Sequence, residues 1–204
     1  MAVRENDLLC HELLLRLAGR LPDRHLWRYR DWLAGDAADV LARTLPNTLV
    51  RERIALNDSE HRVLSDALLP FGASSALINA ILPGAEPSSE TYAFSAESPA
   101  ERHGDPELLV LGATLRGRRG VGEVRSTWRI DEDERPKRIV LVEATVDVVE
   151  LTGEIQRILR ALGEHEPCVE VFSPEMESNS YHRQALTESL LVCTGAEELV
   201  GQRG

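Results

Sequence analysis

A strand, a helix and a second strand follow one another between Lys137 and Phe172, and this order constrains the fold more than any other feature. Arg138–Thr145 is an apolar, β-branched run of strand length, and Cys168–Phe172 is a second one. Between them, apolar residues recur at the spacing of one helical face: Val148, Leu151, Ile155, Ile158, Leu159 and Leu162. A helix that joins two strands of one sheet is typical of parallel pairing, so we expect these strands to lie parallel.

The ends of this helix carry their own signals. Asp147, with Glu150 three residues later, is expected to cap its first turn through a side-chain oxygen. Gly163 suits the left-handed residue that often ends a helix, and Pro167 separates it from the strand that follows.

The first 82 residues predict a bundle of about six short helices. Each has an apolar face, such as Cys10, Leu13, Leu14 and Leu17 in the first. The expected limits are a start at Asn6 or Asp7, Asp23–Ala34, Asp36 to Pro46, Thr48–Leu56, a start at Asn57 with Glu60 in a capping box, and Ser74 to Pro83. Helices this short are not stable alone, so we expect them to pack together.

Residues 83–106 differ in composition, being rich in proline, serine and acidic residues. Such a segment buries little apolar surface, so we interpret it as a linker between domains 1–82 and 107–204 that fold independently. Tyr92 and Phe94 are its exceptions, and we expect them to dock onto a flanking domain.

The C-terminal domain, 107–204, is predicted to be a mixed β-sheet with helices, in the order βββαβαβ. Its first two strands are expected at Glu107–Leu115 and Gly122–Ile130, joined by a hairpin turn. A helix around Tyr181–Thr187 and a strand around Ser189–Thr194 complete it. The fold class is therefore α+β with two domains.

Charge and composition exclude several classes of protein. A net charge of −11 disfavours a general nucleic-acid or anionic-membrane binder. No apolar run approaches the ~20 residues of a membrane helix, and the N-terminal stretch does not resemble a secretory signal. Cys10, Cys168 and Cys193 are expected to be reduced core thiols, which indicates the cytoplasm. Lys137 is the only lysine among 23 basic residues, which suggests the codon bias of a GC-rich bacterial genome.

Three strands, a helix and a strand are also the core order of restriction-endonuclease-like nucleases. Those sites need an acid near the end of the second strand, then an acid and a lysine one residue apart on the third, to hold Mg²⁺ and polarise water. Asp131 or Asp133 suits the first role and Glu143 the second, but Thr145 stands where the lysine is needed. We therefore interpret Glu143 as a surface residue.

Two groups of arginines are candidate binding residues. The predicted hairpin turn contains Arg116, Arg118 and Arg119, and such a turn could bind a phosphate group or a nucleic acid. The simpler interpretation is that the acidic turn Asp131–Glu134 neutralises these arginines. The second group is spaced four residues apart along a predicted helix, near Trp27 and Trp32, and consists of Arg20, Arg24 and Arg28. We expect Arg24, Arg28 and Trp32 to be candidate contacts for a partner. The alternative is that they belong to an ordinary exposed helix face.

Catalytic and metal-binding motifs are missing from the sequence. There is no nucleophile elbow, phosphate-binding loop, dinucleotide fingerprint or zinc motif, and the six histidines have no ligand spacing, so we predict no cofactor and no metal. His165 and Cys168 are close in sequence, but a buried thiol is the simpler interpretation. Tyr181, His182 and Arg183 follow a polar loop and are the most site-like neighbours.

These observations favour a non-catalytic cytoplasmic protein that interacts with or regulates a protein partner, with the helical domain as docking module. The alternative is a nucleic-acid-binding or degenerate nuclease-like protein that uses the Arg116–Arg119 turn. A third possibility is an enzyme whose site is assembled from loops around Tyr181–Arg183.

Overall fold

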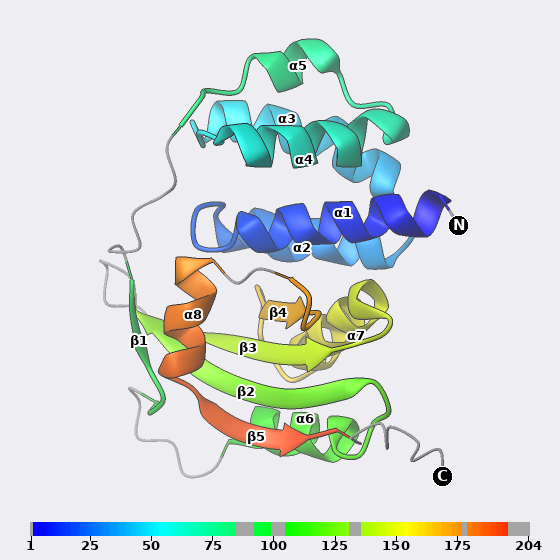
Figure 1. Ribbon diagram of the computed structural model, residues 1–204. Coiled ribbons are helices and arrows are strands. Elements are labelled where there is room, and N and C mark those ends of the chain that lie inside the picture. The colour runs from blue at the N-terminus through cyan, green and yellow to red at the C-terminus, as the bar shows by residue number, and fades with distance from the viewer. Residues whose placement is uncertain (1, 85–91, 99–104, 131–135, 177–178, 196–204) are drawn as a thin grey trace, which may run out of the picture. The chain divides into compact units, whose positions relative to one another are not determined.

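The computed structural model describes residues 2–84, 92–98, 105–130, 136–176 and 179–195 (Figure 1). The chain divides into two compact units. The helical unit comprises residues 1–91 with 149–156, and the sheet unit comprises 92–148 with 157–204. Independent folding of 1–82 and 107–204 across a linker at 83–106 stays a prediction.

The helical unit confirms the predicted bundle. Its elements are α1 (Ala2–Arg16), α2 (Asp23–Ala34), α3 (Ala38–Arg51), α4 (Asp58–Leu68), a 3₁₀ turn at Leu69–Phe71 and α5 (Ser75–Asn79). The expected apolar faces are buried, including the leucines at 13, 14, 17, 41, 45, 64 and 68. The helical part of the α+β fold was therefore readable from periodicity.

The predicted third and fourth helices form one helix, α3, which continues through Pro46. Proline inside a helix loses one backbone hydrogen bond and was expected to end it. Pro46 is buried on the same face as Leu45 and Leu49, so tertiary packing offsets the lost bond.

Three predicted side-chain caps, at Asn6 or Asp7, Asp36 and Asp147, were wrong, whereas those at Asn57 and Ser74 are confirmed. Helix α1 begins at Ala2, so Asp7 lies inside it. Asp36 and Asp147 both have left-handed backbones, and neither α3 nor α7 has a side-chain cap hydrogen bond. At α4 the predicted capping box is present, because Asn57 Oδ1 accepts from the Glu60 amide at 2.9 Å and Glu60 Oε2 accepts from the Asn57 amide at 3.0 Å.

The sheet unit contains five strands among its described residues. In chain order they are β1 (Ala93–Ser95), β2 (Val121–Ile130), β3 (Pro136–Ala144), β4 (Cys168–Phe172) and β5 (Leu190–Thr194), with helices α6 (Pro106–Leu115) and α8 (Ser180–Thr187). Helix α7 (Val148–Ala161) follows β3, and its residues 149–156 are assigned to the helical unit. The order across the sheet is β1-β2-β3-β4, and β5 also pairs with β2. Strands β3 and β4 are parallel, with Leu141 opposite Glu170, so the predicted crossover is confirmed.

Glu107–Leu115, predicted to be a strand, is helix α6. Asp105 Oδ1 accepts from the Leu108 amide at 3.1 Å, and Pro106 occupies the first helical position, where proline is favoured. A continuous apolar run is compatible with either a buried strand or a buried helix. Here the capping by Asp105 and the proline at the first position favour the helix. Three strands still precede α7, because β1 lies within the segment predicted to be a linker.

The predicted docking of the two linker aromatics is confirmed within the sheet unit. The rings of Tyr92 and Phe94 meet the ring of Tyr181 edge to face, at 6.0 and 5.2 Å between centroids. The guanidinium of Arg129 lies 4.9 Å from the centre of the Tyr92 ring. These contacts hold β1 on the sheet.

Candidate functional site

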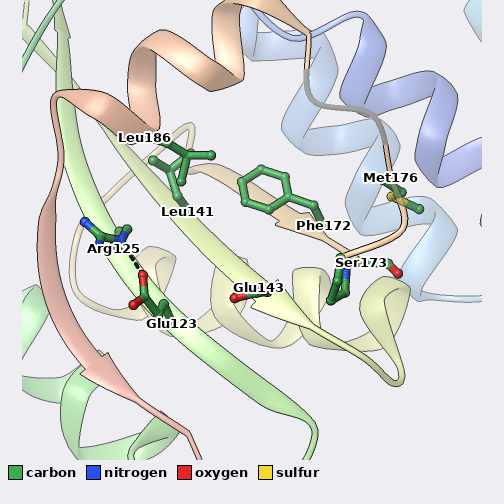
Figure 2. Close-up of a pocket in the computed structure, with 9 residues that line it drawn as sticks. Glu123, Arg125, Leu141, Glu143, Phe172, Ser173, Met176 and Leu186 are labelled. Atoms are coloured by element: carbon green, nitrogen blue, oxygen red, sulfur yellow. Dashed lines mark hydrogen bonds and ion pairs between the residues drawn. The ribbon is translucent and has the colours of Figure 1, made fainter.

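A pocket of about 300 Å³ opens at the carboxyl ends of the parallel strands β3 and β4 (Figure 2). Strand β2 supplies Glu123 and Arg125, and β3 supplies Leu141 and Glu143. The remaining lining residues are Phe172 of β4, Ser173, Pro174 and Met176 of the following loop, and Leu186 of α8. Loops at the carboxyl ends of parallel strands are a common position for binding sites.

An irregularity in strand pairing shapes this pocket. Val121 lies opposite Ala144 and Val124 opposite Val142, so β2 has one residue more than β3 between these pairs. The extra residue is a β-bulge, a feature that changes the direction of side chains and is common beside functional sites. A β-carbon at Gly122 would lie 3.0 Å from Glu143 Oε2, so this glycine leaves the space that the Glu143 side chain occupies.

The three charged residues of the pocket are not equivalent. Glu123 Oε2 accepts from Arg125 Nε at 2.6 Å, so these charges compensate each other. Arg125 also donates to Ser189 Oγ at 3.4 Å. The exposed Glu143 carboxylate makes no hydrogen bond or ion pair with any residue that the structure describes. The pocket therefore carries one uncompensated negative charge.

Behind the pocket lies a buried polar cluster. His182 Nε2 is 3.3 Å from Glu170 Oε2, and both side chains are almost fully buried. The His182 ring meets the ring of Phe172 at 5.4 Å, which connects this cluster to the pocket wall. Arg129 donates to the Tyr181 hydroxyl at 3.3 Å. Burial raises the pKa of Tyr181 well above its usual value, although the charge of Arg129 opposes the shift.

The predicted site-like neighbours Tyr181, His182 and Arg183 lie on α8, where their side chains point in different directions. Tyr181 and His182 face the sheet, whereas Arg183 is exposed. Tyr181 and His182 therefore support the pocket from behind and do not line it.

The cluster Arg116–Gly120 is not a hairpin tip, because it joins α6 to β2. Arg116 and Arg119 are exposed and Arg118 is half-buried. The Gly117 amide donates to the Thr194 carbonyl at 3.1 Å, which ties the turn to β5. The acidic turn expected to neutralise these arginines, Asp131–Glu134, lies outside the described residues, so that neutralisation stays a prediction.

The predicted arginine stripe is divided by the structure, because Arg20 lies in the turn before α2 and only Arg24 and Arg28 lie on the helix. Arg20 points inward, where it forms an ion pair with Glu60 and donates to the Ala55 carbonyl at 3.1 Å. Arg24 and Arg28 are exposed as predicted. Trp32 is half-buried, with its ring 5.5 Å from that of Tyr29.

Glu52 joins Arg24 to two further basic groups. Its Oε1 lies 3.2 Å from Arg24, 3.3 Å from His25 Nε2 and 3.4 Å from Arg51. Desolvation raises the pKa of Glu52, but its bonds to His25 and Arg24 outweigh this and lower it overall. Burial lowers the pKa of His25, with the charges of Arg24 and Arg51 adding to the effect. Two arginines thus share one carboxylate beside a histidine whose charged form is disfavoured.

Of the residues considered for nuclease chemistry, Asp131 and Asp133 lie outside the described residues, and Glu143 and Lys137 are not brought together. Glu143 lines the pocket, but Lys137 lies at the other end of β3, six residues or about 20 Å away in an extended strand. Lys137 lines a different cavity of about 350 Å³ with His165. Among the described residues no group of three or more possible ligands is placed to hold a metal ion.

All three cysteines are buried and none of them forms a disulfide bond, as expected of core thiols. Burial raises the pKa of Cys10 to about 12, with a further contribution from the charge of Asp7. Cys168 donates to the Glu166 carbonyl at 3.8 Å, while His165 is exposed. A thiol of this kind is a poor nucleophile.

Glu123, Arg125, Phe172, Met176 and Leu186 were missed by sequence reasoning. Glu123 and Arg125 alternate in a predicted strand, and this pattern could have indicated that they share one face of the sheet. Glu143 near the end of a parallel strand could have indicated where the pocket lies on that sheet.

Comparisons with known proteins give no relative: no family model, curated protein or solved structure matches this chain. Within the described residues, no helix is both long and apolar enough to cross a membrane.

Proposed function

We propose that this protein acts by binding a protein partner rather than by catalysis, with α2 and the end of α3 as its docking face. The observation that carries the proposal is the convergence of Arg24, His25 and Arg51 on the single carboxylate of Glu52. Because the lowered pKa of His25 favours its neutral form, Arg24, Arg51 and Glu52 together carry one net positive charge.

Arg28 extends the docking face. Its guanidinium lies 5.6 Å from the centre of the Trp27 ring, and the Arg28 side chain is exposed. Arginine over an aromatic ring presents donors to a carboxylate while its stem covers apolar surface. Exposed arginine and half-buried tryptophan are residue types enriched at interaction surfaces.

An acidic segment is the partner chemistry that fits this face. The chain as a whole carries a charge of −11, so a local positive surface opposes the overall charge and favours one orientation for an acidic partner. The three buried thiols are consistent with a reducing compartment, and we propose the bacterial cytoplasm as its location.

The test is a fluorescence-anisotropy titration of the protein into a labelled decaglutamate peptide at low salt. We expect weak binding that salt reduces, and that the double substitution Arg24→Glu and Arg28→Glu abolishes. The matched control is Arg43→Glu with Arg62→Glu, which makes the same change in net charge on exposed residues of α3 and α4. Equal losses in the two double variants would mean that only net charge matters, and would refute the docking face.

The alternative function, nucleic-acid binding through Arg116–Arg119, keeps the support of two exposed arginines at one turn. If each bound a phosphate, affinity would fall by roughly one logarithmic unit per logarithmic unit of salt for each contact. We expect no sub-micromolar binding of duplex DNA, single strands or RNA at physiological salt. Sub-micromolar, salt-sensitive binding that Arg118→Glu removes would favour the alternative.

A further inference from the structure

The pocket of the sheet unit combines one free carboxylate with apolar walls. Glu143 makes no polar contact with the described residues, whereas Glu123 is paired with Arg125 at 2.6 Å. Leu141, Phe172 and Leu186 provide apolar surface on the same side of the sheet (Figure 2). A group that suits both features is a cation carried on a short aliphatic chain.

The size of the pocket limits the ligand. About 300 Å³ is at the lower end of the range for small-molecule sites. A single long side chain or a small amine fits within such a volume.

The backbone and the aromatic wall hold this arrangement in place. Glu143 lies over Gly122, where a β-carbon would come within 3.0 Å of its Oε2 atom. Phe172 is held by the edge contact of its ring with His182, which is itself paired with the buried Glu170. An aromatic face beside a carboxylate attracts a cation through its quadrupole as well as through charge.

We propose that the pocket lined by Glu143 and Phe172 binds an alkylammonium group. Glu143 accepts the charged hydrogen bonds, Phe172 faces the ammonium, and Leu186 contacts the methylene chain. The group comes either from a lysine side chain of a polypeptide or from a free small amine, since both present the same chemistry. This site goes beyond the docking face on α2, because all of its residues belong to the sheet unit.

The experiment is an NMR titration of the ¹⁵N-labelled full chain with butylammonium chloride, 1-butanol and sodium butyrate. We expect butylammonium to shift amide signals of Glu143, Phe172 and Met176, with butanol and butyrate much weaker. The Glu143→Gln variant is expected to bind butylammonium about fivefold more weakly, the upper end for an exposed ion pair. The matched control is Glu175→Gln on the neighbouring loop, which should bind as the wild type does.

Two results would overturn the proposal. Stronger binding of butyrate than of butylammonium would show that Arg125, not Glu143, recognises the ligand. Unchanged affinity of the Glu143→Gln variant for butylammonium would show that the carboxylate does not take part in binding. The source of the ammonium group is read from a second pair of probes, acetyl-Gly-Lys-Gly-amide and its norleucine analogue. A lysine peptide that binds more tightly than butylammonium assigns the site to polypeptides, and a weaker one assigns it to free amines; both support the ammonium chemistry.

Discussion

The two faces of the β-sheet differ sharply, although they are built from the same three strands. Alternate residues of a strand point to opposite faces. One face carries the buried residues Val124, Val140, Val142, Val169 and Val171. The other carries the polar residues Arg125, Thr127, Arg129, Glu143 and Glu170 together with the buried Ile139 and Leu141. Both faces therefore bury apolar surface, and the second face also carries these polar groups.

The polar face is itself divided in two. Under α8, Glu170 and Arg129 are buried and have partners on that helix, His182 and Tyr181. At the pocket, Glu143 is exposed and unpartnered within the described part of the chain. Charges in the buried half therefore serve stability, and the charge in the open half is available for a ligand.

The largest expected effect comes from the buried half. Glu170→Ala leaves His182 and its surroundings without their carboxylate partner, and removing one member of a buried pair destabilises by about 3 kcal/mol or more. Urea denaturation followed by circular dichroism measures this free energy of unfolding. Glu123→Ala, which breaks an exposed pair, serves as control and should lose less than about 1 kcal/mol. A loss below about 1 kcal/mol for Glu170→Ala would show that the buried pair does not hold α8 on the sheet.

Substitutions of two neighbouring residues on β3 allow the contributions of the two sheet faces to stability to be compared directly. Val142 is fully buried, so Val142→Ala should reduce the free energy of unfolding by about 2 kcal/mol through lost burial and a new cavity. Glu143→Ala should change it by no more than about 0.5 kcal/mol, because this side chain is exposed. The same denaturation experiment measures both, and similar losses would contradict the assignment of the two faces.

A smaller effect is expected at alkaline pH. Burial raises the pKa of Tyr181 above the value of about 10 that it has in the unfolded chain. The unfolded chain then loses this proton first, so stability is retained below about pH 10 and falls above it by about 1.4 kcal/mol per pH unit per tyrosine. Tyr181→Phe should make the decline in unfolding free energy between pH 10 and 11 shallower. An unchanged slope in this variant would place the tyrosine hydroxyl in water.

The smallest expected effect concerns metals in the open half. Glu143 lacks the neighbouring lysine of the nuclease pattern, so Mg²⁺, Mn²⁺ or Zn²⁺ at millimolar concentration should move the melting temperature by less than about 1 °C. Differential scanning fluorimetry is sufficient for this measurement. A clear rise that Glu143→Ala abolishes would instead support a nuclease-like site.

Much of the fold could be predicted from local pattern. Periodicity placed α2 at Asp23–Ala34 and the crossover from β3 to β4, and the capping box at Asn57 marked the start of α4. Errors occurred where a local signal was ambiguous. The apolar run at Glu107–Leu115 suits two structures, and Pro46 is tolerated in α3 because its packing offsets a lost hydrogen bond.

The candidate site was harder to predict from the sequence, because its residues come from separate segments of the chain. The sequence singled out Glu143 as a possible acid but not Phe172 or Leu186, which reach the same pocket from β4 and α8. It also singled out Arg24 and Arg28, but only the structure adds Arg51 from the end of α3.

By itself, the sequence determined the helices with clear apolar faces and the parallel pair of strands joined by a helix. These depend on residues a few positions apart, whose spacing is written in the chain. Only the tertiary structure decided that β1 and β5 share β2 as neighbour and that a bulge places Gly122 beneath Glu143. The reason is that strand register and side-chain packing depend on contacts between distant segments, which no local pattern records.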